Sequence, residues 1–208
     1  MKPFITLTAV AAPLDIAKID TGVILPGRFM RIRRIPGVAD YADAFVHDLR
    51  FDEKDQPRAD FLLNQPAYCG AAILVTGRDF GCGSSREGAA YAVLDFGVRA
   101  LIGSSFGDVF VGNCLQNGIV PAVLPIAAVR DLWRQLKEHP GAQITVDLVK
   151  QAVIAPDGTR HEFAIDATRK ERLLKGLDDV GVTLEHLPQI EAFEAAYRQR
   201  MPWRASMI

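Results

Sequence analysis

The architecture of this chain is most readily worked out from residues 79–87, which read Asp79-Phe80-Gly81-Cys82-Gly83-Ser84-Ser85-Arg86-Glu87. An apolar run over residues 71–75 precedes this stretch and predicts a buried strand, while residues 88–94 after it predict a helix. The glycines, the hydroxyl groups and the arginine are therefore expected where a strand passes into a helix. The start of a helix has unpaired backbone N–H groups and the positive end of the helix dipole, so this position favours an anion.

Two interpretations of this junction are open. Ser84 and Glu87 match the S-x-x-E capping box, so the junction could be a well-capped helix start with Arg86 in solvent. Alternatively, the planar guanidinium group of Arg86 could bind a carboxylate there. Nucleotide binding is not expected, because the run lacks the third glycine of a dinucleotide fingerprint and no Gly-Lys-Ser/Thr follows it.

The remaining sequence alternates strand and helix patterns, which is typical of an α/β domain with a β-rich part beside it. Strands are predicted at residues 4–14, 23–25, 71–75, 99–103, 119–124, 144–149 and 152–155, with a hairpin partner ending near residue 165. Helices are predicted at residues 40–47, 85–96, 106–116, 127–138, 167–175 and 187–200, with Ser105 as a candidate cap of the third. Residues 51–65 are predicted to form an exposed loop, and Asp178 and Asp179 to shape a turn or cap a chain reversal.

A cluster of arginines precedes the first predicted helix. It comprises Arg28, Arg31, Arg33 and Arg34. Such a cluster is usually a solvated face of a globular protein. Because it follows Asp20 so closely in the sequence, it could also contact an acidic substrate or a partner.

The composition indicates a soluble globular protein with one domain, or one domain and a small appendage. The chain has 208 residues, of which 49% are hydrophobic and 24% charged. Its net charge of −1 at pH 7 predicts no general attraction to nucleic acid or to acidic membranes. No apolar run approaches the roughly 18–20 residues that span a bilayer, and the N-terminus lacks a signal-peptide pattern, so we expect a cytoplasmic protein.

The cysteines and histidines predict no metal site in this chain. The 3 cysteines include no Cys-x-x-Cys pair, and the 4 histidines share no ligand spacing. The odd number of cysteines also argues against a disulfide framework. Cys82 could be a nucleophile, but no histidine lies near it in the sequence, and packing beside the turn is the favoured interpretation.

Several segments resemble the swivelling domain of the aconitase superfamily and follow its order. They are residues 81–87, 104–110, 113–114 and 117–121, together with residues 19–26, which resemble that family's Asp-Thr-Asp-x-Ile-Ile-Pro segment. Residues 176–184 resemble the tail of bacterial small subunits of 3-isopropylmalate dehydratase. The resemblance implies an aconitase-like swivelling β/β/α fold, with residues 1–208 forming one such domain and a C-terminal helical extension.

The resemblance also implies an activity. The expected role is that of the small subunit of a hydro-lyase in leucine biosynthesis, which isomerises 2-isopropylmalate and 3-isopropylmalate by dehydration and rehydration and is active only with a large subunit. No cofactor is expected in this chain, since a four-iron four-sulfur (4Fe-4S) cluster on the large subunit would act as the Lewis acid. By position in the motif, Ser84 is the expected catalytic base, acting as an alkoxide. The expected ligands of the small dicarboxylate substrate are Ser85, Arg86, Asp20 and Thr21.

Two departures from the family pattern leave alternatives open. Gly22 stands in place of the second Asp of the N-terminal segment, and Gly88 stands where many members carry His. A paralogous hydro-lyase subunit for citraconate or a methylated malate is one alternative, and a non-catalytic dicarboxylate-binding module is another. A serine hydrolase fits less well, because the sequence around Ser84 is not a G-x-S-x-G elbow.

Overall fold

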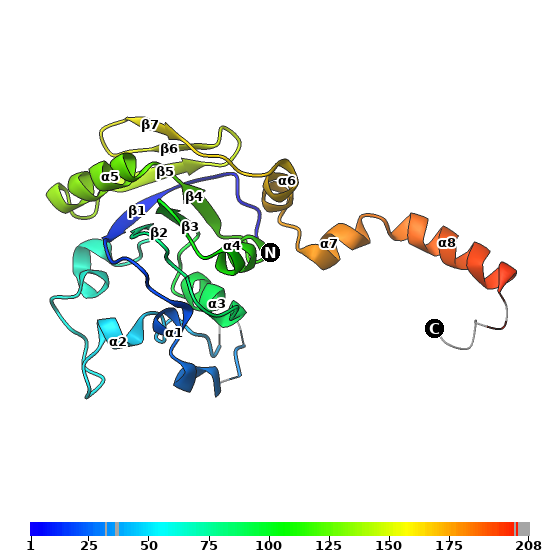
Figure 1. Cartoon of the computed structure of the whole chain (residues 1–208), viewed down its shortest axis with the longest axis horizontal. Helices are drawn as coiled ribbons and strands as arrows, with labels where there is room; N and C mark the ends of the chain where they lie inside the picture. Colours follow the sequence, from blue (N-terminus) through cyan, green and yellow to red (C-terminus); the bar gives the residue numbers. More distant parts are fainter. Residues whose placement is uncertain (32, 36–37, 202, 204–208) are drawn as a thin grey trace.

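The computed structural model describes residues 1–31, 33–35, 38–201 and 203, and its main feature is one mixed sheet with helices on both faces (Figure 1). The strands are β1 (Thr6–Leu14), β2 (Ile73–Thr76), β3 (Ala100–Gly103), β4 (Val120–Val123), β5 (Gln143–Asp147), β6 (Ala152–Ile154) and β7 (Arg160–Glu162). The helices are α1 (Thr21–Ile24), α2 (His47–Arg50), α3 (Glu87–Asp95), α4 (Asp108–Gln116), α5 (Ile126–Glu138), α6 (Ala167–Lys175), α7 (Asp179–Leu184) and α8 (Leu187–Arg200). Short 3-10 turns cover Gly27–Arg31, Leu62–Asn64 and Pro66–Tyr68.

The long strand β1 joins a parallel half of the sheet to an antiparallel half. The strand order is β4-β3-β2-β1-β5-β6-β7. Strands β1 to β4 pair in parallel, whereas β5 pairs with β1 and β6 in antiparallel fashion, as does β7 with β6. In the described chain, β4 and β7 are the edge strands, and Pro121 lies in the middle of β4.

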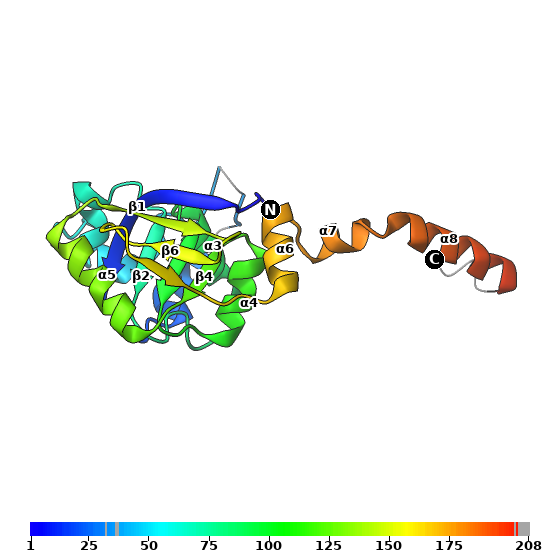
Figure 2. The same ribbon diagram turned by 90° about the horizontal axis from the view of Figure 1, so that it is seen from above.

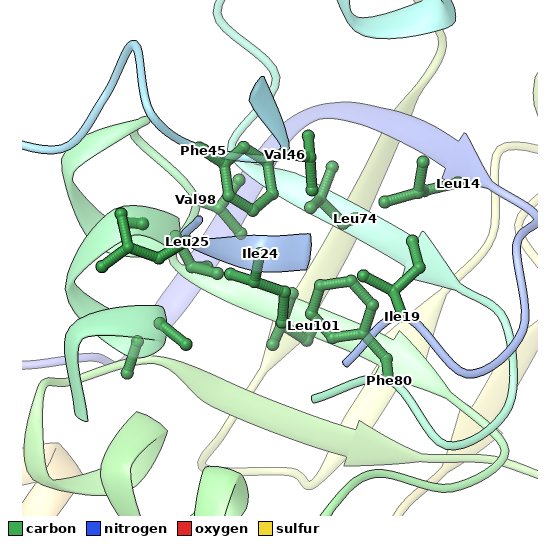
Figure 3. Packing of buried hydrophobic residues seen from close by; sticks show 14 of the residues in the cluster. Leu14, Ile19, Ile24, Leu25, Phe45, Val46, Leu74, Phe80, Val98 and Leu101 are labelled. Carbon is green, nitrogen blue, oxygen red and sulfur yellow. The ribbon is translucent and has the colours of Figure 1, made fainter. Parts of the chain in front are cut away.

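Alternate residues of the buried strands supply two separate cores. Leu74 of β2 and Leu101 of β3 face the core that α1, α3 and α4 cover, and Figure 3 shows them packed around Ile24. Ile73 of β2 faces the other way, into the core closed by α5 and α6. A sheet buried on both faces explains why β2 and β3 are continuous apolar runs.

The C-terminal helices extend away from this body. Figures 1 and 2 show α7 and α8 projecting from the end of the molecule next to α6. Neither α7 nor α8 has a buried residue. In the part of the chain that the structure describes, no helix is long and apolar enough to cross a membrane.

The structure corrects three sequence-based predictions. Residues 23–25 do not form a strand, because the side chain of Asp20 caps the short helix α1 there. The predicted helix over residues 40–47 begins only at His47, after turns over residues 41–46 that include Val46 in the left-handed conformation. Helix α7 was not predicted, although Asp178 does cap it by accepting a hydrogen bond from the N–H of Gly181 at 2.7 Å.

Candidate active site

The site predicted from the sequence forms where the segments after β1 and β2 meet. These strands are parallel neighbours, so the segments that follow them leave the sheet on the same side, at the carboxyl ends of the strands. A β-bridge pairs Asp20 with Cys82, and the N–H of Thr21 donates to the carbonyl of Cys82 at 3.0 Å. The N–H of Gly81 donates to the carbonyl of Ile19 at 2.7 Å. The two predicted segments, 62 positions apart at this bridge, therefore form one structure at the edge of the sheet.

Thr21 and Ser84 are in direct contact. Their hydroxyl oxygens lie 2.9 Å apart, and either hydroxyl could be the donor. The Thr21 hydroxyl also lies within donating distance of the Ser84 carbonyl oxygen, at 3.2 Å. Thr21 is only 1% exposed, whereas Ser84 is exposed. The buried Thr21 hydroxyl is thus in contact with Ser84, and its role as a substrate ligand stays a prediction.

Asp20 uses its carboxylate to begin α1. Its Oδ1 atom accepts hydrogen bonds from the N–H groups of Gly22 at 2.6 Å and Val23 at 3.2 Å. The side chain as a whole is exposed, so it also lies at the surface of the candidate site. Capping of α1 is thus a role that the prediction of Asp20 as a substrate ligand did not include.

Arg86 stands at the N-cap position of α3 and makes no side-chain cap bond. A Cβ atom added to Gly22 would lie 3.5 Å from the Nη1 atom of Arg86, so the Arg86 guanidinium group reaches the beginning of α1. Arg86 is half-buried, and within the described residues its guanidinium group has no hydrogen-bond or ion-pair partner. A half-buried, unpaired guanidinium group at a helix start is well suited to bind a carboxylate.

The predicted capping box between Ser84 and Glu87 is absent. Helix α3 begins at Glu87, so Ser84 lies too far before it to cap the first turn, and its hydroxyl contacts Thr21 instead. The Glu87 carboxylate accepts from the Asn117 side chain at 3.2 Å. Burial raises the pKa of the Tyr91 hydroxyl, and its hydrogen bond to Glu87 raises that pKa further. Ser85 is exposed beside Ser84, and its hydroxyl makes no hydrogen bond to the other candidate residues.

The loop before Ser84 is held by contacts that the sequence analysis missed. Asp79 has a φ of +57°, and its carboxylate accepts from the Ser105 hydroxyl at 2.6 Å while its N–H donates to the same oxygen at 2.9 Å. Ser105, predicted to cap α4, serves this loop instead, because α4 begins later with Gly107 at its N-cap position. A Cβ on Gly107 would lie 2.3 Å from the Gly81 carbonyl oxygen, so a larger residue would push the two loops apart. The close approach of these two loops had a signal in the sequence: Gly81 and Gly107 each lie in one of the motif segments.

The arginine cluster divides into paired and unpaired members. Arg34 binds Asp95 of α3 through two hydrogen bonds of 2.7 and 2.6 Å, which raise the pKa of its guanidinium group. Arg28 pairs with Asp48 at the surface. Arg31 and Arg33 are exposed, and neither has a partner within the described residues. The prediction of a solvated face therefore fits only part of the cluster.

The three cysteines are free and differ in burial. Cys69 is exposed, Cys82 is half-buried and Cys114 is buried, and burial raises the pKa of the Cys114 thiol well above its ordinary value. In the described part of the chain, no group of three or more His, Cys, Asp and Glu side chains could hold a metal ion. These residues do not fit an iron–sulfur cluster.

Comparison with known proteins supports the resemblance seen in the motifs. The family model described as the aconitase C-terminal domain matches residues 1–127. A model described as LeuD_N matches residues 130–167, and one described as the C-terminal domain of the 3-isopropylmalate dehydratase small subunit matches residues 179–205. The last of these models spans α7 and α8.

Individual relatives match over nearly the whole chain. A 3-isopropylmalate dehydratase small subunit from Jannaschia sp. (strain CCS1) is 46% identical over 203 residues, covering 98% of this chain and 100% of the relative. One from Dechloromonas aromatica (strain RCB) is 44% identical over 212 residues, covering 98% and 99%. The crystal structure of 3-isopropylmalate dehydratase (leuD) from Methanocaldococcus jannaschii shares the fold, with a TM-score of 0.65 at 21% identity, over 90% of this chain and 99% of that one. Domain, C-terminal arm and full-length identity agree, and the chain belongs to the 3-isopropylmalate dehydratase small subunit family.

Proposed function

We propose that this chain is the small subunit of a two-subunit hydro-lyase that interconverts 2-isopropylmalate and 3-isopropylmalate in leucine biosynthesis. One observation carries the proposal: Ser84, an exposed residue whose hydroxyl contacts Thr21, precedes Arg86 by two positions, and Arg86 stands at the start of α3 with a guanidinium group that has no partner among the described residues. In this arrangement Ser84 could accept a proton from a 2-hydroxy acid, and Arg86 could bind one of its carboxylates. Family membership supplies the reaction class.

In this proposal Ser84 is the base that removes and returns the substrate proton. A serine hydroxyl is a very weak acid, so its alkoxide needs a positive potential close by. Arg86 and the unpaired N–H groups at the start of α3 supply such a potential from within this chain. Arg86 would bind one substrate carboxylate through two parallel hydrogen bonds, with Ser85 donating another.

The proposal requires a large subunit. Ser84 and Ser85 are exposed at the edge of the sheet, so this chain by itself does not enclose a substrate. Because the described residues do not fit a 4Fe-4S cluster, we assign the cluster to the large subunit. The roles proposed for the residues of this chain do not involve binding the cluster. We further propose that residues 1–208 form one domain with a helical extension and that the complex is cytoplasmic.

A second candidate, a hydro-lyase acting on a smaller methylated malate, is favoured by the two glycine departures. A Cβ on Gly22 would lie 3.0 Å from the Asp20 carboxylate, and one on Gly88 would lie 2.9 Å from Leu25 Cδ2. The packing here therefore suits glycine at both positions, and Gly22 brings no polar side chain to the Arg86 Nη1 atom.

The test is reconstitution with the large subunit from the same organism. The chain, the large subunit and the anaerobic mixture would each be assayed with 2-isopropylmalate, citraconate and a methylated malate, following the unsaturated intermediate by its ultraviolet absorbance. We expect turnover of isopropylmalate in the mixture alone. Turnover of only the smaller acids would favour the second candidate, and binding without turnover in a complete complex would contradict both.

A further inference from the structure

We infer that Thr21 is a positioning residue whose single hydroxyl proton changes acceptor when Ser84 ionises. This inference rests on the proposed role of Ser84 and assigns to Thr21 a function other than substrate binding. Three atoms carry it: the Thr21 hydroxyl oxygen, the Ser84 hydroxyl oxygen 2.9 Å away and the Ser84 carbonyl oxygen 3.2 Å away.

A threonine hydroxyl has one proton to donate and two lone pairs that accept. When Ser84 is neutral, both contacts are satisfied if Thr21 donates to the carbonyl and accepts from the Ser84 hydroxyl. When Ser84 is an alkoxide, it has no proton to give, and two oxygen atoms with lone pairs would face each other at 2.9 Å. Rotation of the Thr21 hydroxyl then turns its proton toward the alkoxide. The proton stays on Thr21, and no covalent bond is made or broken.

The surroundings of Thr21 suit this exchange. Thr21 is 1% exposed, so solvent does not compete for its hydroxyl group. Its backbone is fixed on both sides, because its N–H donates to Cys82 at 3.0 Å and its carbonyl accepts from Leu25 at 3.0 Å. The carbonyl that loses the Thr21 proton belongs to Ser84, which is an exposed residue. The exchange therefore replaces a neutral hydrogen bond with one to a charged group, which is the stronger kind.

The variants are Thr21→Val, which keeps the shape but removes the hydroxyl, and Thr21→Ser, which keeps the hydroxyl. In the reconstituted complex we expect Thr21→Val to lower kcat/KM for isopropylmalate by about tenfold to a hundredfold near neutral pH, the size of a hydrogen bond to a charged group. The acidic limb of its pH profile should move to higher pH, and Thr21→Ser should restore both. Thr8→Val removes a hydroxyl from the Thr8–Thr145 pair on the distant β1–β5 contact and should change neither.

A second measurement does not depend on the activity. In a Ser84→Cys chain, the pH dependence of alkylation gives the pKa of the new thiol, followed by site-resolved mass spectrometry because Cys82 lies two residues away. Adding Thr21→Val should raise that thiol pKa by about one unit, since the thiolate loses its donor, and Thr21→Ser should return it. The other charged or titratable groups close to position 84 are Cys82, Arg86 and Glu87, which lie within three positions of it in the chain, and Asp20, which is bridged to Cys82. They are unchanged between these variants.

The two measurements separate the possible failures. If the wild-type complex does not turn over isopropylmalate, the proposed function fails, and the thiol titration still tests Thr21. An unchanged thiol pKa in the Thr21→Val background would overturn the inference whatever the activity. A loss of activity in Thr21→Val without a shift in the pH profile would assign Thr21 a packing role only and would also overturn it.

Discussion

Ser84 presents its hydroxyl at the surface and is not the cap of α3. We expect Ser84→Ala to lower kcat of the reconstituted complex by about 10²–10⁴, because a positioned base acts mainly in the transition state, with a smaller change in KM. Since the substitution removes no helix cap but does remove the hydrogen bond to the buried Thr21 hydroxyl, the free energy of unfolding should fall by about 0.5–1.5 kcal/mol. Steady-state kinetics and a thermal melt check both values. A folded, assembled variant with normal kcat would remove Ser84 from the base role.

Arg86 offers a test of whether geometry or charge matters at the helix start. Lysine keeps the charge but lacks the planar pair of donors that matches a carboxylate. Hydrogen bonds to charged groups contribute about 1.5–3 kcal/mol, so kcat/KM of Arg86→Lys should fall about tenfold to a hundredfold. Arg130→Lys, on an exposed part of α5, is the matched control and should behave as wild type. A wild-type kcat/KM for Arg86→Lys would mean that Arg86 is merely solvated.

At the residue scale, the sequence predicted which residues gather at the site better than what each one does. Asp20, Thr21, Ser84 and Arg86 do lie together, because the motifs that contain them follow parallel neighbouring strands. The capping by Asp20 and the burial of Thr21 were not predicted, because both depend on contacts that are not local in the sequence, and the substrate-binding roles of the two residues stay predictions. The hydrogen bond between the Thr21 and Ser84 hydroxyls spans 63 residues and follows from the register of β1 against β2, which no local pattern reveals.

Among the secondary-structure elements, α1 depends on its cap. Asp20→Ala removes the carboxylate that accepts from Gly22 and Val23, and should destabilise the protein by about 0.5–2 kcal/mol. Asp20→Asn keeps a capping oxygen, so its stability should stay close to wild type. Urea unfolding of the two variants gives this comparison. Equal stability of both would show that capping is not what Asp20 contributes.

Helix α3 is linked to the arginine-bearing segment by Arg34 and Asp95. The two side chains are only 19% and 6% exposed, and Asp95 also accepts from the N–H of Tyr41 at 3.0 Å. We expect Asp95→Asn to lower the free energy of unfolding by about 1.5–3 kcal/mol, because the paired guanidinium group loses its charged acceptor. Asp48→Asn breaks the exposed pair with Arg28 and should cost at most about 1 kcal/mol. Chemical denaturation of both variants makes the comparison, and equal losses would contradict this ranking.

Elements with strong local signals were predicted best. Helices α6 and α8 begin and end at the predicted residues, since periodic patterns with clear boundaries define them. The strands also occur where predicted, apart from residues 23–25. Helices α1 and α7 were missed because each is short, contains a glycine and depends on an aspartate cap rather than on a long apolar pattern. The core on both faces of the sheet follows from the apolar strands, but the order of the strands does not.

In the whole molecule, the arm formed by α7 and α8 adds no residue to either core. Deleting residues 187–208 should therefore leave the free energy of unfolding of the body within about 0.5 kcal/mol of wild type. Thermal melts monitored by near-ultraviolet circular dichroism, which reports the packed body, provide the measurement. The cut leaves the contact between Lys175 and Glu185 intact. A large drop in the melting temperature would show that α8 packs on the body in solution.

The two edge strands of the sheet affect whether the subunit aggregates before it assembles with its partner. An open strand edge can pair with another chain and begin aggregation. The N–H groups of Val120 and of Leu124, which directly follows β4, donate toward β3, so Pro121 and Val123 hold the outward positions, and Pro121 has no N–H to offer. At the opposite end, β7 is 3 residues long and places Arg160 and Glu162 on that rim. Both edges are thus poor templates for strand addition, and the unassembled subunit should stay monomeric at concentrations where an open edge would nucleate fibres.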